Sequence, residues 1–148
     1  MVIGIIGESC TGKSTLAERL IHELKVEVFS GKDYLKLAKS EAAAKEAFQQ
    51  KLQDAITSSN VIYVISEKEH LSLLPEGALR VLLTAELALI KERFAARMHG
   101  NLPAPVSLML EKKHGCFDQV AHNIRIVSGE TDLDEVCAQI VKLAGEAL

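Results

Sequence analysis

The loop after the first apolar run places the strongest constraint on this chain. Residues 2–6 are apolar or glycine, and residues 7–14 read Gly-Glu-Ser-Cys-Thr-Gly-Lys-Ser, which fits the pattern G-x-x-x-x-G-K-[ST] at every fixed position. Glycine tolerates positive φ and lets successive backbone N–H groups approach an anion. The helix that follows adds unpaired N–H groups and the positive end of its dipole. The pattern therefore predicts a phosphate-binding loop (P-loop) between a strand and a helix.

Two side chains of this P-loop have roles set by their chemistry. Lys13 is expected to reach the β- and γ-phosphates of ATP, and the Ser14 hydroxyl is expected to bind Mg²⁺. The predicted nucleotide-binding residues of the loop are Gly7, Glu8, Ser9, Cys10, Thr11, Gly12, Lys13, Ser14 and Thr15. The alternative is a strand, turn and helix whose glycines serve only the turn. The preceding strand, the following helix and all motif positions favour phosphate binding.

Composition indicates one globular domain, residues 1–148, and argues against several kinds of partner. Aromatic residues make up 4% of the chain and the net charge is −3, which disfavours a nucleic-acid polymer. The three cysteines lack C-x-x-C spacing, so we expect neither a disulfide framework nor a zinc site. Apolar runs are too short for a signal peptide or a membrane span. We expect a cytoplasmic protein without a membrane partner, and the sequence leaves its oligomeric state open.

The order of predicted elements indicates a three-layer α/β/α P-loop NTPase fold with a largely parallel sheet of about five strands. Apolar runs predict strands at residues 2–6, 26–29, 61–65, 80–84 and 123–127, with 61–65 as a central strand. Apolar periodicity predicts helices after the P-loop and at residues 40–58, 85–98, 106–113 and 133–143. The first helix is expected to bury Leu16, Leu20 and Ile21. Asp33 is placed to cap a further helix from about Tyr34.

Four stretches, taken in order along the chain, resemble the nucleoside-monophosphate kinases, which include adenylate and cytidylate kinases. The first is the P-loop, the most specific of the four. Residues 29–36, Phe-Ser-Gly-Lys-Asp-Tyr-Leu-Lys, resemble the family's S-x-G-D-x-L-R segment after the second strand. Residues 89–97 are similar to its R-x-x-G-R at the edge of the lid, and residues 126–136 resemble its V-D-G-T…E-V tail. The four matching stretches are distributed over most of the length of the chain.

The resemblance implies roles for five residues outside the P-loop. Asp33 would lie near the Mg²⁺ and the phosphates, and Lys36 would hold the acceptor's phosphate. Arg93 would stack on the adenine ring, and Arg97 would stabilise charge on the transferring phosphoryl group. Gly129 would let the backbone approach the base.

The chain also departs from the family, chiefly around the acceptor. Lys36 replaces an arginine, which keeps the charge but loses bidentate phosphate recognition. The third strand is followed by Ser-Glu-Lys-Glu in place of Asp-Gly-Arg, so Glu67 becomes the candidate carboxylate for Mg²⁺. The acceptor-side helices, residues 33–58, are shortened. The short lid, residues 97–115, carries lysines and a histidine where the family has further arginines.

The candidate side chains outside the P-loop also have purely structural interpretations. Asp33 caps its helix, and Lys36 is a solvated helix residue. Glu67 is one of several polar residues that follow the predicted strand 61–65. Arg93 and Arg97 pair at the surface with glutamates of their own helix.

These features together predict a phosphotransferase that moves the γ-phosphoryl of ATP to a nucleoside monophosphate, with Mg²⁺ as cofactor. Lys13, Asp33 and Arg97 are the predicted catalytic residues, and Asp33 and Lys36 the predicted acceptor-binding ones. One alternative is a kinase of another small metabolite, such as shikimate, gluconate or a cofactor precursor. A second is an ATP-binding protein without transferase activity.

Overall fold

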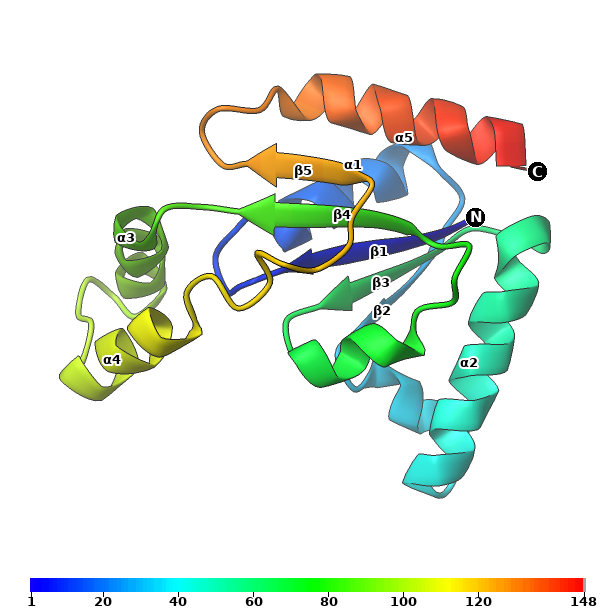
Figure 1. Ribbon diagram of the computed structural model, residues 1–148, viewed down its shortest axis with the longest axis horizontal. Helices are drawn as coiled ribbons and strands as arrows, with labels where there is room; N and C mark the ends of the chain where they lie inside the picture. Colours follow the sequence, from blue (N-terminus) through cyan, green and yellow to red (C-terminus); the bar gives the residue numbers. More distant parts are fainter. Residues whose placement is uncertain (148) are drawn as a thin grey trace.

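Five parallel strands form the middle layer of the molecule (Figure 1). The computed structural model describes residues 1–147. The strands are β1 (Val2–Gly7), β2 (Glu27–Ser30), β3 (Val61–Ile65), β4 (Leu79–Thr84) and β5 (Ile124–Val127). Their order is β2-β3-β1-β4-β5, so β1 lies in the middle and β3, residues 61–65, is an interior strand as predicted. In register, Ile5 of β1 lies between Val64 of β3 and Val81 of β4.

Helices cover both faces of the sheet, which confirms the three-layer fold (Figure 1). Helices α1 (Lys13–Glu23) and α5 (Leu133–Ala147) pack on one face. Helix α2 (Glu41–Ser58) and the 3₁₀-helices η1 (Asp33–Leu37) and η2 (Lys68–Leu73) pack on the other. Helices α3 (Leu87–Arg97) and α4 (Ala104–Lys113) lie beyond the carboxyl ends of the strands. Within residues 1–147, no helix is both long and apolar enough to cross a membrane.

The alternating direction of the side chains along β1 explains why the chain forms two hydrophobic cores. Ile3 and Ile5 belong to the core under α1 and α5, whereas Val2 and Ile6 belong to the core under α2. Successive side chains of a strand point to opposite faces, and all four are fully buried. A strand that is apolar at consecutive positions therefore needs helices on both sides, as β1 has.

An aromatic cluster fills the core under α2. The ring of Phe48 lies 4.9 Å from that of Phe29, 5.5 Å from that of Tyr34 and 4.8 Å from that of Tyr63, measured between centroids. The Tyr63 hydroxyl donates a hydrogen bond of 2.8 Å to the carbonyl oxygen of Gly31. Burial raises the pKa of this phenol, so Tyr63 stays protonated and holds the chain just after β2.

Several local predictions were wrong. Ile21 is 47% exposed, because α1 buries a narrow stripe through Leu16 and Leu20 and position 21 lies at its edge. Asp33 does not cap a helix: its Oδ2 accepts a hydrogen bond of 2.9 Å from the Ser30 N–H, and residue 33 itself begins η1. Helix η2 was not predicted, α4 begins two residues earlier than expected, and α5 continues to Ala147.

We expect Phe48→Ala to destabilise the fold strongly. Phe48 is fully buried and contacts three other aromatic rings, so its removal leaves a cavity. The free energy of unfolding, measured by urea denaturation, should fall by about 3–5 kcal/mol. The exposed Ile21→Ala is the control and should change it by less than about 0.5 kcal/mol. Equal effects of the two substitutions would contradict this core assignment.

Candidate nucleotide-binding site

The P-loop lies at the carboxyl edge of the sheet, between the central strand β1 and α1. Its backbone uses left-handed conformations at Gly12 (φ 98°) and Cys10 (φ 63°). A Cβ at Gly7 would lie 2.6 Å from the backbone oxygen of Leu83 on β4, so only glycine fits there. A left-handed cysteine is uncommon, and such strain concentrates at ligand-binding sites. The geometry thus agrees with a loop shaped to hold an anion.

Hydrogen bonds inside the P-loop hold it in this shape. The carbonyl oxygen of Glu8 accepts a bond of 2.8 Å from Thr11 Oγ1 and another of 2.5 Å from Lys13 Nζ. Thr11 and Lys13 are both buried. Burial lowers the pKa of the Lys13 ammonium to about 8. Cys10 and Glu8 oppose this shift, and the positive charge of Arg97 adds to it.

Two cavities flank the P-loop. The first, of about 380 Å³, lies between the loop, α3 and the segment after β5; we call it the α3-side cavity. Residues that line it include Cys10, Gly12, Arg93, Arg97, Ser128 and Gly129. The second, of about 260 Å³, lies between the loop and the ends of β2 and β3; we call it the β3-side cavity. Residues that line it include Lys13, Ser14, Ser30, Val64, Ser66 and Arg97. Arg97 therefore borders both.

Arg93 ties the P-loop to the segment after β5. One guanidinium nitrogen donates a hydrogen bond of 2.9 Å to the carbonyl oxygen of Cys10, and another donates one of 2.8 Å to Ser128 Oγ. Gly129, next to Ser128, has φ 86°. These contacts fix one wall of the α3-side cavity and place a planar cation on it.

The end of α4 contacts the P-loop through Glu8. The carboxylate of Glu8 accepts a hydrogen bond of 3.1 Å from the Gly115 N–H, and its other oxygen lies 3.1 Å from His114 Nδ1. Cys10 packs against Ile90 of α3 and Leu110 of α4. Helices α3 and α4 therefore contact the loop through Cys10 and Glu8. Both residues occupy positions at which the P-loop motif allows any amino acid.

The structure brings Lys13, Ser14, Arg93, Arg97 and Gly129 together around the P-loop, as the sequence suggested. Their roles in binding and catalysis stay predictions.

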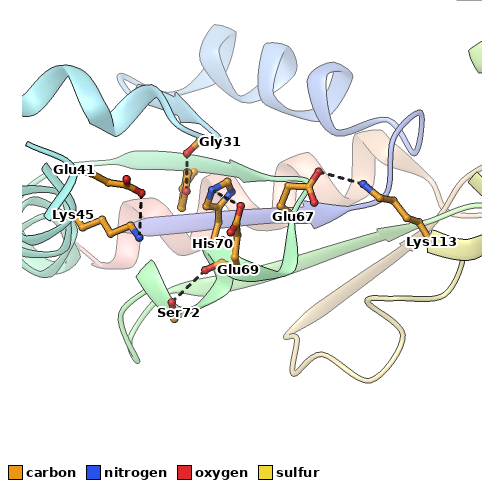
Figure 2. Close-up of polar contacts among 9 residues, drawn as sticks. Gly31, Glu41, Lys45, Glu67, Glu69, His70, Ser72 and Lys113 are labelled. Atoms are coloured by element: carbon orange, nitrogen blue, oxygen red, sulfur yellow. Dashed lines mark hydrogen bonds and ion pairs between the residues drawn. The ribbon is translucent and has the colours of Figure 1, made fainter. Parts of the chain in front are cut away.

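The remaining predicted residues lie outside the two cavities' linings. Asp33 binds the amide of Ser30, which itself lines the β3-side cavity. Lys36 places its Nζ 4.9 Å from the centroid of the Phe29 ring. Glu67 forms an exposed ion pair of 3.4 Å with Lys113 (Figure 2).

Sequence reasoning missed the serines of the site. Ser30 ends β2, Ser66 follows β3 and Ser128 follows β5, so all three lie at the carboxyl edge of the sheet. Ligands of open α/β sheets bind at this edge. A small polar residue at the end of each predicted parallel strand was therefore a usable signal.

The oxygen donors of the β3-side cavity suit Mg²⁺. Ser14 and Ser66 supply hydroxyl groups there, and Mg²⁺ prefers hard oxygen ligands with several waters and substrate phosphates. Among residues 1–147, no group of three or more His, Cys, Asp and Glu side chains could hold a metal ion. The residues fit an ion that arrives with the nucleotide and takes most of its ligands from phosphates and water.

No protein-family model matches this sequence, and no curated protein matches it. Solved structures do resemble the fold. A gluconokinase from Sinorhizobium meliloti is 14% identical, with 98% of this chain and 94% of that chain covered and a TM-score of 0.61. The YorR protein of Bacillus subtilis, in complex with phosphorylated GDP, is 22% identical over 98% and 96%, with a TM-score of 0.60. Shikimate kinase from Acinetobacter baumannii, in complex with shikimate, is 14% identical over 98% and 93%, with a TM-score of 0.59. At these identities the likeness shows a shared three-layer P-loop fold.

The pKa of Lys13 generates a prediction for nucleotide affinity. Only the protonated amine attracts phosphate, and a pKa of about 8 means that the charge is lost as the pH rises through that value. The dissociation constant for ATP should therefore increase about tenfold between about pH 7 and about pH 9. Isothermal titration calorimetry at constant Mg²⁺ measures this, with Lys13→Met as a variant whose weak binding should not vary with pH. A wild-type affinity that stays constant over this range would contradict it.

Proposed function

We propose that this protein is an ATP-dependent kinase of a small molecule. The observation that carries the proposal is the pair of cavities on either side of a preformed P-loop, with Arg97 at the border of both. The α3-side cavity, which is lined by the guanidinium groups of Arg93 and Arg97 and by Gly129 with no side chain, suits the base and ribose. The β3-side cavity, with Lys13 and Ser14, suits the phosphates and the reacting end of an acceptor. The fold shared with gluconokinase and shikimate kinase supports the same interpretation.

The proposed reaction is a direct phosphoryl transfer. An oxygen of the acceptor forms a bond to the γ-phosphorus as the bond to the bridging oxygen breaks, and the electron pair stays on the β-phosphate of ADP. The amides of the P-loop and Lys13 hold the phosphates, and Arg97 neutralises charge on the transferring group. Bound Mg²⁺ would supply further neutralisation, with the Ser14 hydroxyl as its protein ligand. Where the acceptor is an alcohol, the Asp33 carboxylate would take its proton, from a position next to the β3-side cavity where its Oδ2 binds the Ser30 amide.

The segment 97–115, which contains α4, serves as the lid in this proposal. Backbone conformations with positive φ flank α4, at His99 (61°) and Gly100 (87°) before it and at Gly115 (81°) after it. Rotation about these positions would move α4 and close the P-loop cavities against water, which protects the γ-phosphate from hydrolysis. The contact of Glu8 with Gly115 couples the lid to the loop that holds the phosphates.

Two classes of acceptor are compatible with this site. A nucleoside monophosphate follows from the resemblance carried by residues 29–36 and 89–97. A hydroxyl group on a small metabolite follows equally well from the fold shared with gluconokinase and shikimate kinase. The position of Lys36 against the Phe29 ring, away from the β3-side cavity, favours the second class.

A panel of acceptors tests the proposal. With ATP and Mg²⁺, ADP release should rise at least about tenfold above background for one member of a panel of nucleoside monophosphates, gluconate and shikimate. Lys13→Ala should abolish this release while the unfolding transition persists, and exposed Lys39→Ala should leave it unchanged. If ATP binds and no acceptor raises turnover, the protein is a nucleotide-binding protein and the kinase proposal fails.

A further inference from the structure

Helix α3 presents one face to the P-loop. Ile90, Arg93 and Arg97 are spaced at i, i+3 and i+7, so their side chains lie on the same side of the helix. Ile90 packs against Cys10, and Arg97 borders both cavities. Arg93 lies between them and is the member of this row whose hydrogen bond reaches the backbone of the loop.

The guanidinium of Arg93 is held at two points. It donates a hydrogen bond of 2.9 Å to the carbonyl oxygen of Cys10 and one of 2.8 Å to Ser128 Oγ. Two bonds from one planar group fix its orientation as well as its position. Stacking on a base would use the face of the guanidinium, whereas these bonds use N–H groups at its edge. Arg93 therefore has a task in this structure that base stacking does not include.

The bond from Arg93 orients one peptide group of the P-loop. Among residues 1–147 no peptide bond is cis, so the C=O of Cys10 and the N–H of Thr11 point in opposite directions from the peptide that they share. With the carbonyl oxygen held by Arg93, this N–H points away from the guanidinium. A loop binds an anion through N–H groups that converge on one place, and a peptide that turned over would remove one of them.

Cys10 depends on this support because its backbone is left-handed, with φ 63°. A residue other than glycine keeps such a conformation only where its surroundings enforce it. The side chain of Cys10 is buried against Ile90 and Leu110, and its carbonyl oxygen is bound by Arg93. The carbonyl oxygen of Glu8, by contrast, is bound by side chains of the loop itself. The loop is thus held from within at Glu8 and from outside at Cys10.

The other end of this connection is anchored by the turn after β5. The Ser128 N–H donates a hydrogen bond of 2.8 Å to the carbonyl oxygen of Thr84, at the end of β4. The turn itself is closed by a bond of 2.9 Å from the Val127 N–H to Thr131 Oγ1. Because the hydroxyl of Ser128 accepts its bond from Arg93, this serine acts on the P-loop through the arginine.

We propose that Arg93 is a positioning residue for the phosphate site. By holding the carbonyl oxygen of Cys10, it keeps the P-loop in the conformation that binds a triphosphate, and Ser128 holds Arg93 in turn. This role rests on the proposed nucleotide binding and is separate from the base stacking that the sequence resemblance implies. It follows that binding of a triphosphate without any base or ribose depends on Arg93 and on Ser128.

Tripolyphosphate and adenosine separate positioning from stacking. Each is titrated into the full chain by isothermal titration calorimetry at constant Mg²⁺. Arg93→Met should weaken the binding of tripolyphosphate at least about tenfold, because a charge-assisted hydrogen bond to the loop is lost. A residue that only stacks on the base would change the affinity for adenosine and leave that for tripolyphosphate unaltered. The matched control is Arg125→Met, at an exposed residue of β5 outside both cavities, and its effect should stay below about twofold.

Two further variants separate positioning from simple attraction between opposite charges. Arg93→Lys keeps the charge but lacks the planar group that makes both bonds, and it should weaken tripolyphosphate binding about fivefold. Ser128→Ala changes no charge and should weaken it about threefold, since one hydrogen bond to Arg93 is lost. In the Arg93→Met background, Ser128→Ala should change the affinity less than about twofold, because the connection is already broken.

Thermal unfolding of each variant shows that it is folded, and Arg93→Lys and Ser128→Ala carry the test if Arg93→Met does not fold. Unchanged tripolyphosphate affinity in both of these variants would overturn the inference and leave nucleotide binding intact. Equal effects of Ser128→Ala in the wild type and in Arg93→Met would also overturn it. Weakened tripolyphosphate binding in a protein that phosphorylates no acceptor would support the inference and contradict the kinase. A wild type that binds neither tripolyphosphate nor ATP would contradict both.

Discussion

The carbonyl oxygen of Glu8 accepts hydrogen bonds from both Thr11 and Lys13, and the shape of the P-loop depends on this pair of contacts. They close the loop on itself before any ligand is bound and keep the Lys13 ammonium buried at its centre. The side chain of Glu8 meanwhile points away from the loop and binds the end of α4, which leaves it only 10% exposed. One residue therefore links the loop's internal geometry to the helices that border it.

The position of β1 explains why this loop has a cavity on each side. β1 lies between β3 and β4, so the P-loop emerges where polar residues from several strands meet. Arg93 anchors the side toward α3, and Arg97 borders both sides. The aromatic cluster around Phe48 holds the segment after β2, which forms one border of the β3-side cavity. Core packing thus positions elements of the site that have no contact with the loop itself.

Features that depend only on residues adjacent in the sequence could be predicted. The P-loop motif and the apolar runs of the strands are local patterns, and the structure confirms the fold that they imply. Strand order was not predictable in the same way, because it depends on which distant strands pair. The contacts of three predicted site residues also depend on the folded structure. Asp33 binds the Ser30 amide, Lys36 lies over the Phe29 ring, and Glu67 pairs with Lys113. The burial of His70 was not predictable either, because it depends on contacts with Tyr34 of η1 and Tyr63 of β3, which are distant in the sequence.

The central claim is that a nucleotide binds across the two cavities of the P-loop. A crystal structure with Mg²⁺ and a non-hydrolysable ATP analogue tests it most directly. The phosphates should lie on the amides of residues 12–14, and the base should occupy the α3-side cavity between Arg93 and Gly129. A base bound outside this cavity, or a P-loop that stays empty at saturating analogue, would contradict it.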